Sequence, residues 1–439
     1  MQLIILGAGI AAISFAYFVQ NIKKIKKIYI LEKDNKPGGL LRSYKFLNNI
    51  SYDVGPHIIF SKYKEVLDLN KNILGANVEQ FRRSNKILYD KKFIKYPFEN
   101  ELSKLKKSEI KYCINSFINN PYEKIKPENM KQFFLSFFGQ GITDLYLEPY
   151  NKKIWKFDPS FLDTQMVERI PRPPKADILK SAKGKKTEGY KHQLFFYYPK
   201  KGGIQSLFDS YVKELNNKVE IINNVKIKKI LKNKKKFFIK SNIKKLSCDK
   251  LISTIPLNEI HNIYNSPKKI KEISKDLKFN SIYICMILVK GDLVGNNFAF
   301  MVPEKNIIFH RISKLNFFGK NYSVKNHSVF QAEITFRYND SIDKLPISKI
   351  KEKIKADLVK IKFANKIKDI KNIEIKKFKY AYVIYDLNHR KNVDNLLKFY
   401  KKKGLNFIGR WGSWEYMNSD QVIYQSSQLA KKIFNIRLK

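Results

Sequence analysis

The chain has 439 residues, 44% of them hydrophobic and 14% aromatic, enough for about two or three domains with a substantial core, and this composition excludes wholesale disorder. Its formal net charge of +47 is compatible with nucleic acid, an anionic membrane or a small anionic substrate such as a phosphate ester. Lysine is spread along the whole chain, as a coding bias would produce, so we expect no specific nucleic-acid partner.

The N-terminal segment is expected to form a strand, a tight turn and a helix. Leu3–Leu6 is a fully apolar run, typical of a buried parallel strand, and a G-x-G-x-x-A pattern follows it. In that pattern Gly7 permits the tight turn, Gly9 lets a pyrophosphate approach the backbone, and Ala12 permits close packing of helix on strand. The helix N-terminus would present free N–H groups to the phosphates.

A second predicted strand, Ile28–Leu31, ends at Glu32, whose carboxylate can accept hydrogen bonds from a ribose hydroxyl. The double glycine Gly38-Gly39 indicates backbone that lies close to a ligand, and Arg42 follows it. Together these segments predict a bound dinucleotide cofactor.

The apolar run from Leu3 to Val19 could also be read as a signal peptide or a short membrane span. However, no basic residue precedes it, and Gly-Ala-Gly at 7–9 interrupts it. No other uncharged stretch is long enough to cross a bilayer. We therefore expect a cytoplasmic protein without a transmembrane segment.

The rest of the chain alternates between helical and strand-like regions. Residues 62–165 are expected to be predominantly helical, and Pro171, Pro173 and Pro174 end that region. The lysine-rich 175–188 stretch is expected to be an exposed loop. Later helices are predicted over 205–215, 347–362 and from Ser419 onward. Strands are predicted at 219–222, 225–230, 237–239, 251–255, 281–290, 297–302, 307–312, 328–336, 373–379 and 405–408.

This order predicts an α/β protein with a discontinuous Rossmann-like cofactor domain. The two N-terminal strands, the strands between 219 and 255 and the last strand would form its sheet. The expected divisions are 1–61, 205–260 and 405–439 for the cofactor domain, 62–165 for a helical substrate-binding insertion, and 166–204 with 261–404 for a substrate domain with a mixed or antiparallel β-sheet. A cleft between these lobes would hold the ligand.

Other kinds of site find little support in the sequence. Cys113, Cys248 and Cys285 form no C-x-x-C pair, and the six histidines form no i,i+4 pair, so neither a disulfide framework nor a metal site is expected. No G-x-S-x-G, P-loop or H-E-x-x-H motif is present. A cofactor that carries the chemistry would explain this absence.

Several segments, in the same order along essentially the whole chain, resemble the flavin-containing UDP-galactopyranose mutases, especially the eukaryotic type. The wider group includes amine oxidases and protoporphyrinogen oxidase. The resemblance is carried by Gly55-Pro56-His57, by Tyr96-Pro97-Phe98 after Arg83, by the P-Y-N-x-x-x-W motif over 149–155, by Arg169, by FYYPKKGG at 196–203, by Arg311, and by G-R-W-G-S-W-x-Y over 409–416 with Asn418. This chain differs from the family at Pro56, Glu99 and Met301.

The resemblance implies a bound FAD, active when reduced, with NADPH or NADH as reductant. It implies interconversion of UDP-galactopyranose and UDP-galactofuranose, for cell-surface polysaccharide synthesis, through a covalent bond between flavin N5 and the sugar. The implied catalytic residues are His57, Arg169, Arg311, Tyr382 and Tyr416. Substrate contacts would come from Arg83, Tyr96, Phe98, Tyr150, Asn151, Trp155, Arg169, Arg311, Tyr382 and Tyr416. The implied cofactor residues are Gly55, His57, Arg410 and Asn418, together with Gly7, Gly9, Ala12, Glu32, Gly38, Gly39 and Arg42 of the N-terminal pattern.

The residue types are consistent with this expectation, but alternatives remain. Arginine binds phosphate oxygens with a planar fork, and in a lysine-dominated chain its use at 83, 169, 311 and 410 is conspicuous, although surface ion pairs would also explain it. The aromatic residues and His57 could instead be core residues.

An oxidase or desaturase of the amine oxidase or protoporphyrinogen oxidase type is the main alternative function. A polyanion binder, which would need basic residues clustered outside the cofactor cleft, is a third, although Lys226–Lys236 is most simply a solvated face. A homo-oligomer is compatible with the sequence.

Overall fold

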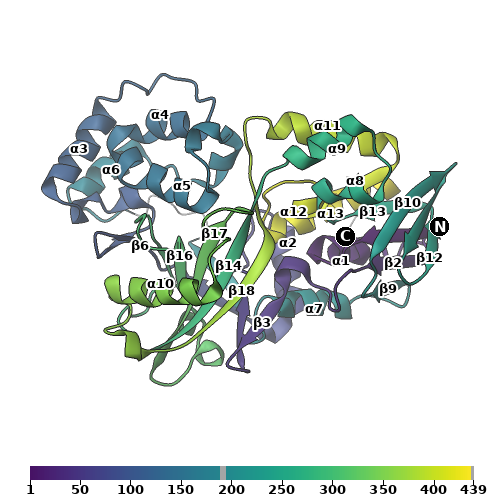
Figure 1. The fold of residues 1–439 in the computed structure, drawn as a ribbon, viewed down its shortest axis with the longest axis horizontal. Helices are drawn as coiled ribbons and strands as arrows, with labels where there is room; N and C mark the ends of the chain where they lie inside the picture. Colours follow the sequence, from purple (N-terminus) through teal and green to yellow (C-terminus); the bar gives the residue numbers. More distant parts are fainter. Residues whose placement is uncertain (188–193, 437–439) are drawn as a thin grey trace.

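The computed structural model describes residues 1–187 and 194–436, except for the side chains of Glu168 and Arg169. Figure 1 shows three regions side by side: a group of helices at one end, a large sheet in the middle, and a second α/β region that carries both termini at the other end. No helix in the described ranges is both long and apolar enough to cross a bilayer.

A five-stranded parallel sheet forms the core of the region with the termini. Its order is β19-β13-β1-β2-β9, with β1 at Gln2–Leu6, β2 at Lys27–Leu31, β9 at Val219–Ile222, β13 at Lys250–Ser253 and β19 at Leu405–Phe407. Helices α1 (Ile10–Val19), α7 (Gln205–Lys213) and α13 (Ser419–Phe434) share one hydrophobic cluster with β1. Because all its strands are parallel and these helices cover one of its faces, this is the predicted Rossmann-like domain.

A separate antiparallel sheet of three strands, here called the meander, lies between β9 and β13 in the chain. It consists of β10 (Ile227–Asn233), β11 (Lys236–Ser241) and β12 (Lys245–Cys248). The prediction that the strands between 219 and 255 belong to the nucleotide-binding sheet is therefore wrong for those expected at 225–230 and 237–239, and β12 was not predicted. Only two and three residues connect the three strands of the meander, and such short links can join antiparallel neighbours but not parallel ones.

The middle region is a seven-stranded mixed sheet, ordered β18-β14-β17-β16-β15-β6-β7. Its strands are β6 (Asn85–Tyr89), β7 (Lys92–Lys95), β14 (Phe279–Lys290), β15 (Ala299–Met301), β16 (Arg311–Lys314), β17 (His327–Phe336) and β18 (Ile370–Val383). Ten successive residues of β14 are buried, which its nearly unbroken apolar sequence allows. Helix α10 (Ile347–Lys360) packs its apolar residues against this sheet.

The segment 62–165 is predominantly helical, as predicted, but it also contains β5 (Val78–Arg82), which pairs with β8 (Phe195–Pro199), as well as β6 and β7. Two local predictions are wrong. The strand expected at 307–312 starts only at Arg311. Part of the expected 175–188 loop is helix α6 (Lys175–Ala182), which begins directly after its N-cap residue, Pro174. Residue 188 lies outside the described residues.

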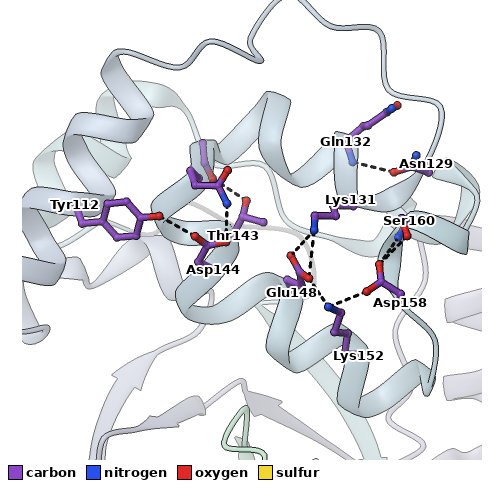
Figure 2. A network of polar contacts seen from close by, with 12 residues as sticks. Tyr112, Asn129, Lys131, Gln132, Thr143, Asp144, Glu148, Lys152, Asp158 and Ser160 are labelled. Atoms are coloured by element: carbon purple, nitrogen blue, oxygen red, sulfur yellow. Dashed lines mark hydrogen bonds and ion pairs between the residues drawn. The ribbon is translucent and has the colours of Figure 1, made fainter.

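The helical region contains α3 (Lys107–Ile118), α4 (Met130–Ile142), a π-helical turn over 143–147, α5 (Glu148–Trp155) and α6. Figure 2 shows the polar network that connects its parts. Glu148 pairs with Lys131 (3.4 Å) and with Lys152, and Lys152 also pairs with Asp158 (2.7 Å). This network fixes the start of α5, and with it the aromatic residues farther along that helix.

The remaining elements connect these regions. They are β3 (Ser43–Phe46), β4 (Ile50–Asp53), α2 (Lys64–Leu74), α8 (Ile260–Ile263), α9 (Lys268–Asp276), α11 (His389–Lys402) and α12 (Gly409–Gly412), together with short 3-10 turns.

Candidate functional site

Two cavities adjoin in the interior. The larger, about 510 Å³, lies at the carboxyl ends of β1 and β2 and is here called the Rossmann cavity. The smaller, about 260 Å³, is lined by residues of β14, β15, β16 and β18 and is called the sheet cavity. Leu40, His57 and Arg410 line both cavities, so a ligand in one would meet a ligand in the other at these residues.

The glycines that line the Rossmann cavity have different structural roles. Gly7 has a φ of 85°, and a Cβ there would lie 2.7 Å from Oγ1 of Thr254, so this position requires glycine. Gly9 has extended backbone, and a Cβ there would meet no atom within 4 Å. The N–H of Gly38 donates to the carbonyl of Ala8 (2.8 Å), which brings the two glycine turns together. The space beside Gly9, in front of the α1 N-terminus, is thus open for a phosphate group.

Glu32 lies at the end of β2, where the sequence predicted a ribose contact. Its side chain is buried, and its two oxygens accept hydrogen bonds from the backbone N–H groups of Ala8 (2.9 Å) and Asp34 (3.0 Å). Arg42 lines the same cavity and forms an ion pair with Asp34 (3.1 Å). Ala12 is fully buried in α1 and does not line the cavity, in keeping with its predicted packing role. These residues fit a dinucleotide cofactor.

His57 lies where the two cavities meet. Its Nδ1 atom is buried and has no hydrogen-bond partner among the described residues. Burial, together with the charge of Arg410, lowers the pKa of His57 to about 3, so its ring is neutral at physiological pH. A neutral imidazole with an unpartnered nitrogen can hydrogen-bond to a ligand at this junction.

Arg410 is held by backbone carbonyls. Its guanidinium donates to the carbonyls of Met417 (2.6 and 2.8 Å) and Ala381 (3.1 Å), and it lies 4.9 Å from the centre of the Tyr416 ring. Asn418 caps α13 and, like Gly55, lines the sheet cavity but not the Rossmann cavity.

An ion pair between a partly exposed arginine and a buried carboxylate forms one wall of the sheet cavity. Arg311 and Glu333 face each other on β16 and β17, and two hydrogen bonds of 2.6 and 2.7 Å join them. Glu333 is fully buried, and the hydroxyl of Tyr382 donates to it at 3.3 Å. Burial is the largest single effect and would lower the pKa of Arg311. The charge and hydrogen bonds of Glu333, together with Tyr382 and Tyr150, outweigh burial and hold that pKa well above its ordinary value. Burial, and then Glu333, raises the pKa of Tyr382 well above its ordinary value. The guanidinium is therefore charged and the phenol neutral.

The predicted substrate residues divide into two groups. Five of them line the sheet cavity: Arg83, Tyr96, Arg311, Tyr382 and Tyr416. The other four whose side chains are described line neither cavity. Trp155 contacts Tyr382 and Tyr416 edge-to-face at ring distances of 5.6 and 5.7 Å, and its indole N–H donates to Asn151 (2.8 Å). Phe98 and Tyr150 stack on Tyr146.

Arg169 cannot be placed in this arrangement. Its backbone ends a short 3-10 turn, Thr164–Arg169, but its side chain lies outside the described part of the structure. Its implied contact with a diphosphate stays a prediction. The described residues contain no group of three His, Cys, Asp or Glu that could hold a metal ion, and the three cysteines are buried and unbridged.

Glu333 is the residue that sequence reasoning missed. It is a carboxylate in strand β17, nine of whose ten residues are buried, and a charged group at such a position normally has a partner. The sequence shows a carboxylate within the predicted strand 328–336, but not that it is buried. The partner could only be identified from the register that places Arg311 opposite it.

Comparisons with known proteins agree with this fold. The family model of NAD(P)-binding Rossmann-like domains matches residues 5–73. A crystal structure of reduced UDP-galactopyranose mutase superposes with a TM-score of 0.89 at 20% identity, covering 100% of this chain and 94% of that chain. A protein provisionally described as a protoporphyrinogen oxidase, from Exiguobacterium sp. 255-15, gives 0.77 at 16% identity, covering 98% of both chains. Putrescine oxidase bound to putrescine gives 0.69 at 12% identity, covering 99% of this chain and 100% of that chain. The chain thus shares the fold of these proteins over essentially its whole length.

Proposed function

We propose that the protein is an FAD-dependent UDP-sugar mutase that interconverts UDP-galactopyranose and UDP-galactofuranose. The observation that carries this proposal is the charge of the sheet cavity, which adjoins the Rossmann cavity. Arg83, Arg311 and Arg410 line it, and no carboxylate is among its described lining residues. The diphosphate group of a nucleotide sugar is a dianion that such guanidinium groups would bind.

The Rossmann cavity would hold FAD. Gly9 and the α1 N-terminus would face the pyrophosphate, and Glu32 would face a ribose. When bound and reduced, by NADPH or NADH, FAD would supply the nucleophile that attacks the anomeric carbon of the sugar. His57, at the junction of the cavities, would donate or accept a hydrogen bond at its free Nδ1.

The residues of the sheet cavity would position the diphosphate while it is separated from the sugar. Glu333 holds the Arg311 fork in one orientation, so that little rotamer freedom remains to be lost when the substrate binds. Because Glu333 balances the charge of Arg311, the excess positive charge comes from Arg83, Arg410 and, as we propose, Arg169. Tyr382 and Tyr416, supported by Trp155, would exclude water from the sugar.

An oxidase acting on an amine or a porphyrinogen is the second candidate, because proteins of those names share the fold. An apolar or cationic substrate would gain nothing from a wall of guanidinium groups. The lining of the sheet cavity therefore favours the mutase.

The test is turnover in the absence of oxygen. The purified protein is reduced with dithionite and incubated with UDP-galactopyranose, and the products are separated by chromatography. We expect a UDP-galactofuranose peak with the reduced protein and none with the oxidised protein. Arg311→Ala should abolish the peak, whereas Arg337→Ala, an exposed arginine outside both cavities, should retain it. Oxygen uptake with an amine or a porphyrinogen, and no furanose product, would establish the oxidase instead.

A further inference from the structure

The meander carries the densest charge in the chain. Residues 223–248 contain ten lysines, no arginine and no acidic residue, so 26 of the 439 residues hold ten of the 47 net positive charges. All ten side chains are exposed, and none of them forms an ion pair with any residue that the structure describes. A coding bias explains lysine everywhere, but not this local absence of acidic partners.

The strand register arranges part of this charge as a row. Lys229 lies opposite Lys240, and Lys240 lies opposite Lys245, so three lysines stand side by side on three neighbouring strands. Like charges directly opposite each other on a sheet are unfavourable. A partner with closely spaced negative charges would remove this repulsion.

The same outer face also carries apolar side chains. Leu231 and Phe238 form the next exposed cross-strand pair, with exposed fractions of 49% and 43%, and Ile243 in the β11–β12 turn is 55% exposed. The inner face of the sheet is different, because Ile230 and Ile239 are buried in the core. The exposed apolar residues are therefore not needed for the fold of the meander.

We propose that the outer face of the meander binds the surface of a membrane that contains anionic lipids. Lysines would contact lipid phosphates, while Leu231, Phe238 and Ile243 would enter the boundary between headgroups and acyl chains. The meander lies at the opposite end of the molecule from the helices α3 to α6, so this contact would leave the helical region free (Figure 1). The proposal is independent of the reaction that the protein catalyses.

A nucleic acid fits this face less well. Proteins that read phosphate geometry favour arginine, and this face has none. Exposed aliphatic side chains such as Leu231 and Ile243 find no partner on a phosphate backbone, whereas a bilayer accommodates both kinds of group.

The test is flotation of the full-length, cofactor-loaded protein with lipid vesicles. We expect binding to vesicles of phosphatidylglycerol and phosphatidylcholine, no binding to phosphatidylcholine alone, and release at high salt. The triple variant Lys229→Glu, Lys240→Glu, Lys245→Glu should weaken binding by about a hundredfold or more. Leu231→Ser with Phe238→Ser should weaken it by about tenfold, without any change of charge.

The matched control reverses three exposed lysines away from the meander, Lys353, Lys366 and Lys368, and so changes the net charge by the same amount. This control should bind vesicles like the wild type. Retained flavin absorbance and an unchanged melting temperature would show that each variant is folded. No vesicle binding by the wild type, an equal loss in the control, or binding to duplex DNA with none to vesicles would overturn the proposal.

Discussion

The ion pair between Arg311 and Glu333 makes a quantitative prediction. Two hydrogen bonds join the partners and Glu333 is fully buried, so Arg311→Met leaves a carboxylate without its countercharge in the protein interior. Removing one partner of such a pair costs about 3–5 kcal/mol of unfolding free energy. With an unfolding entropy of roughly 2.1 cal/mol/K per residue, this corresponds to a fall in melting temperature of about 4 °C if the chain unfolds as one unit.

The double variant separates stability from binding. Replacing both residues, Arg311→Met with Glu333→Leu, should recover most of the lost stability, because apolar residues of similar volume often replace a buried ion pair without cost. UDP affinity should not recover, because it depends on the guanidinium. A lost charge-assisted contact should lower UDP affinity by about tenfold to a hundredfold.

Thermal melting and UDP titration of the wild type, both single variants and the double variant form a complete cycle. Flavin absorbance would serve as the control for folding. The reasoning would be refuted if the two single losses of stability simply added in the double variant, or if Arg311→Met bound UDP as tightly as the wild type.

Three further predictions concern groups outside this pair. Burial raises the pKa of Glu99 to about 8, so between about pH 4.5 and 8 the folded protein holds a proton that the unfolded chain has released, and stability should fall as pH rises. Glu99→Gln should remove this loss in melts at about pH 5 and about pH 8. An equal fall in stability in both proteins would contradict the prediction. Burial lowers the pKa of Lys153 to about 7, so stability should rise with pH between about 7 and 10.5. Lys153→Met should flatten that rise in melts at about pH 7 and about pH 10, and an unchanged rise would show that Lys153 does not cause it. Gly139→Ala should destabilise the helical region by roughly 2 kcal/mol or more in urea unfolding, because φ is 70° there and a Cβ would overlap with the carbonyl oxygen of Ser116. Gly184→Ala is the control and should cost less, because Gly184 has a similar φ but open space around it. Equal costs would show that the overlap at Gly139 is relieved.

Much of the Rossmann-like domain could be predicted from sequence. Strands β1 and β2 are mostly apolar, and a residue with a clear local role follows each of them. Gly7 follows β1 and has a positive φ, and Glu32 follows β2 and accepts hydrogen bonds from two backbone N–H groups. By contrast, β5 is a short strand whose residues are all at least partly exposed, so it shows no apolar alternation to detect. Its strand conformation depends on pairing with β8, more than a hundred residues later in the chain.

The candidate site, too, could be predicted only in part from the sequence. Single residues such as Arg311 and Tyr416 were identified by type and motif, and both line the sheet cavity. Their environment was not predictable, because the partner of Arg311 comes from another strand and depends on register. Trp155 was expected to touch a ligand, whereas the structure places it behind two tyrosines. Distance from a cavity is a tertiary property that spacing along the chain does not report.

Cofactor binding tests the central claim most directly. The backbone of Gly9 is extended and a Cβ there would touch nothing, so Gly9→Val should leave the melting temperature of the cofactor-free protein unchanged while it fills the space that we assign to the pyrophosphate. FAD titration, followed by flavin absorbance and fluorescence, should show tight binding to the wild type and none to Gly9→Val. A wild-type protein that is purified colourless and does not take up added FAD, or a Gly9→Val variant that binds it normally, would contradict the account.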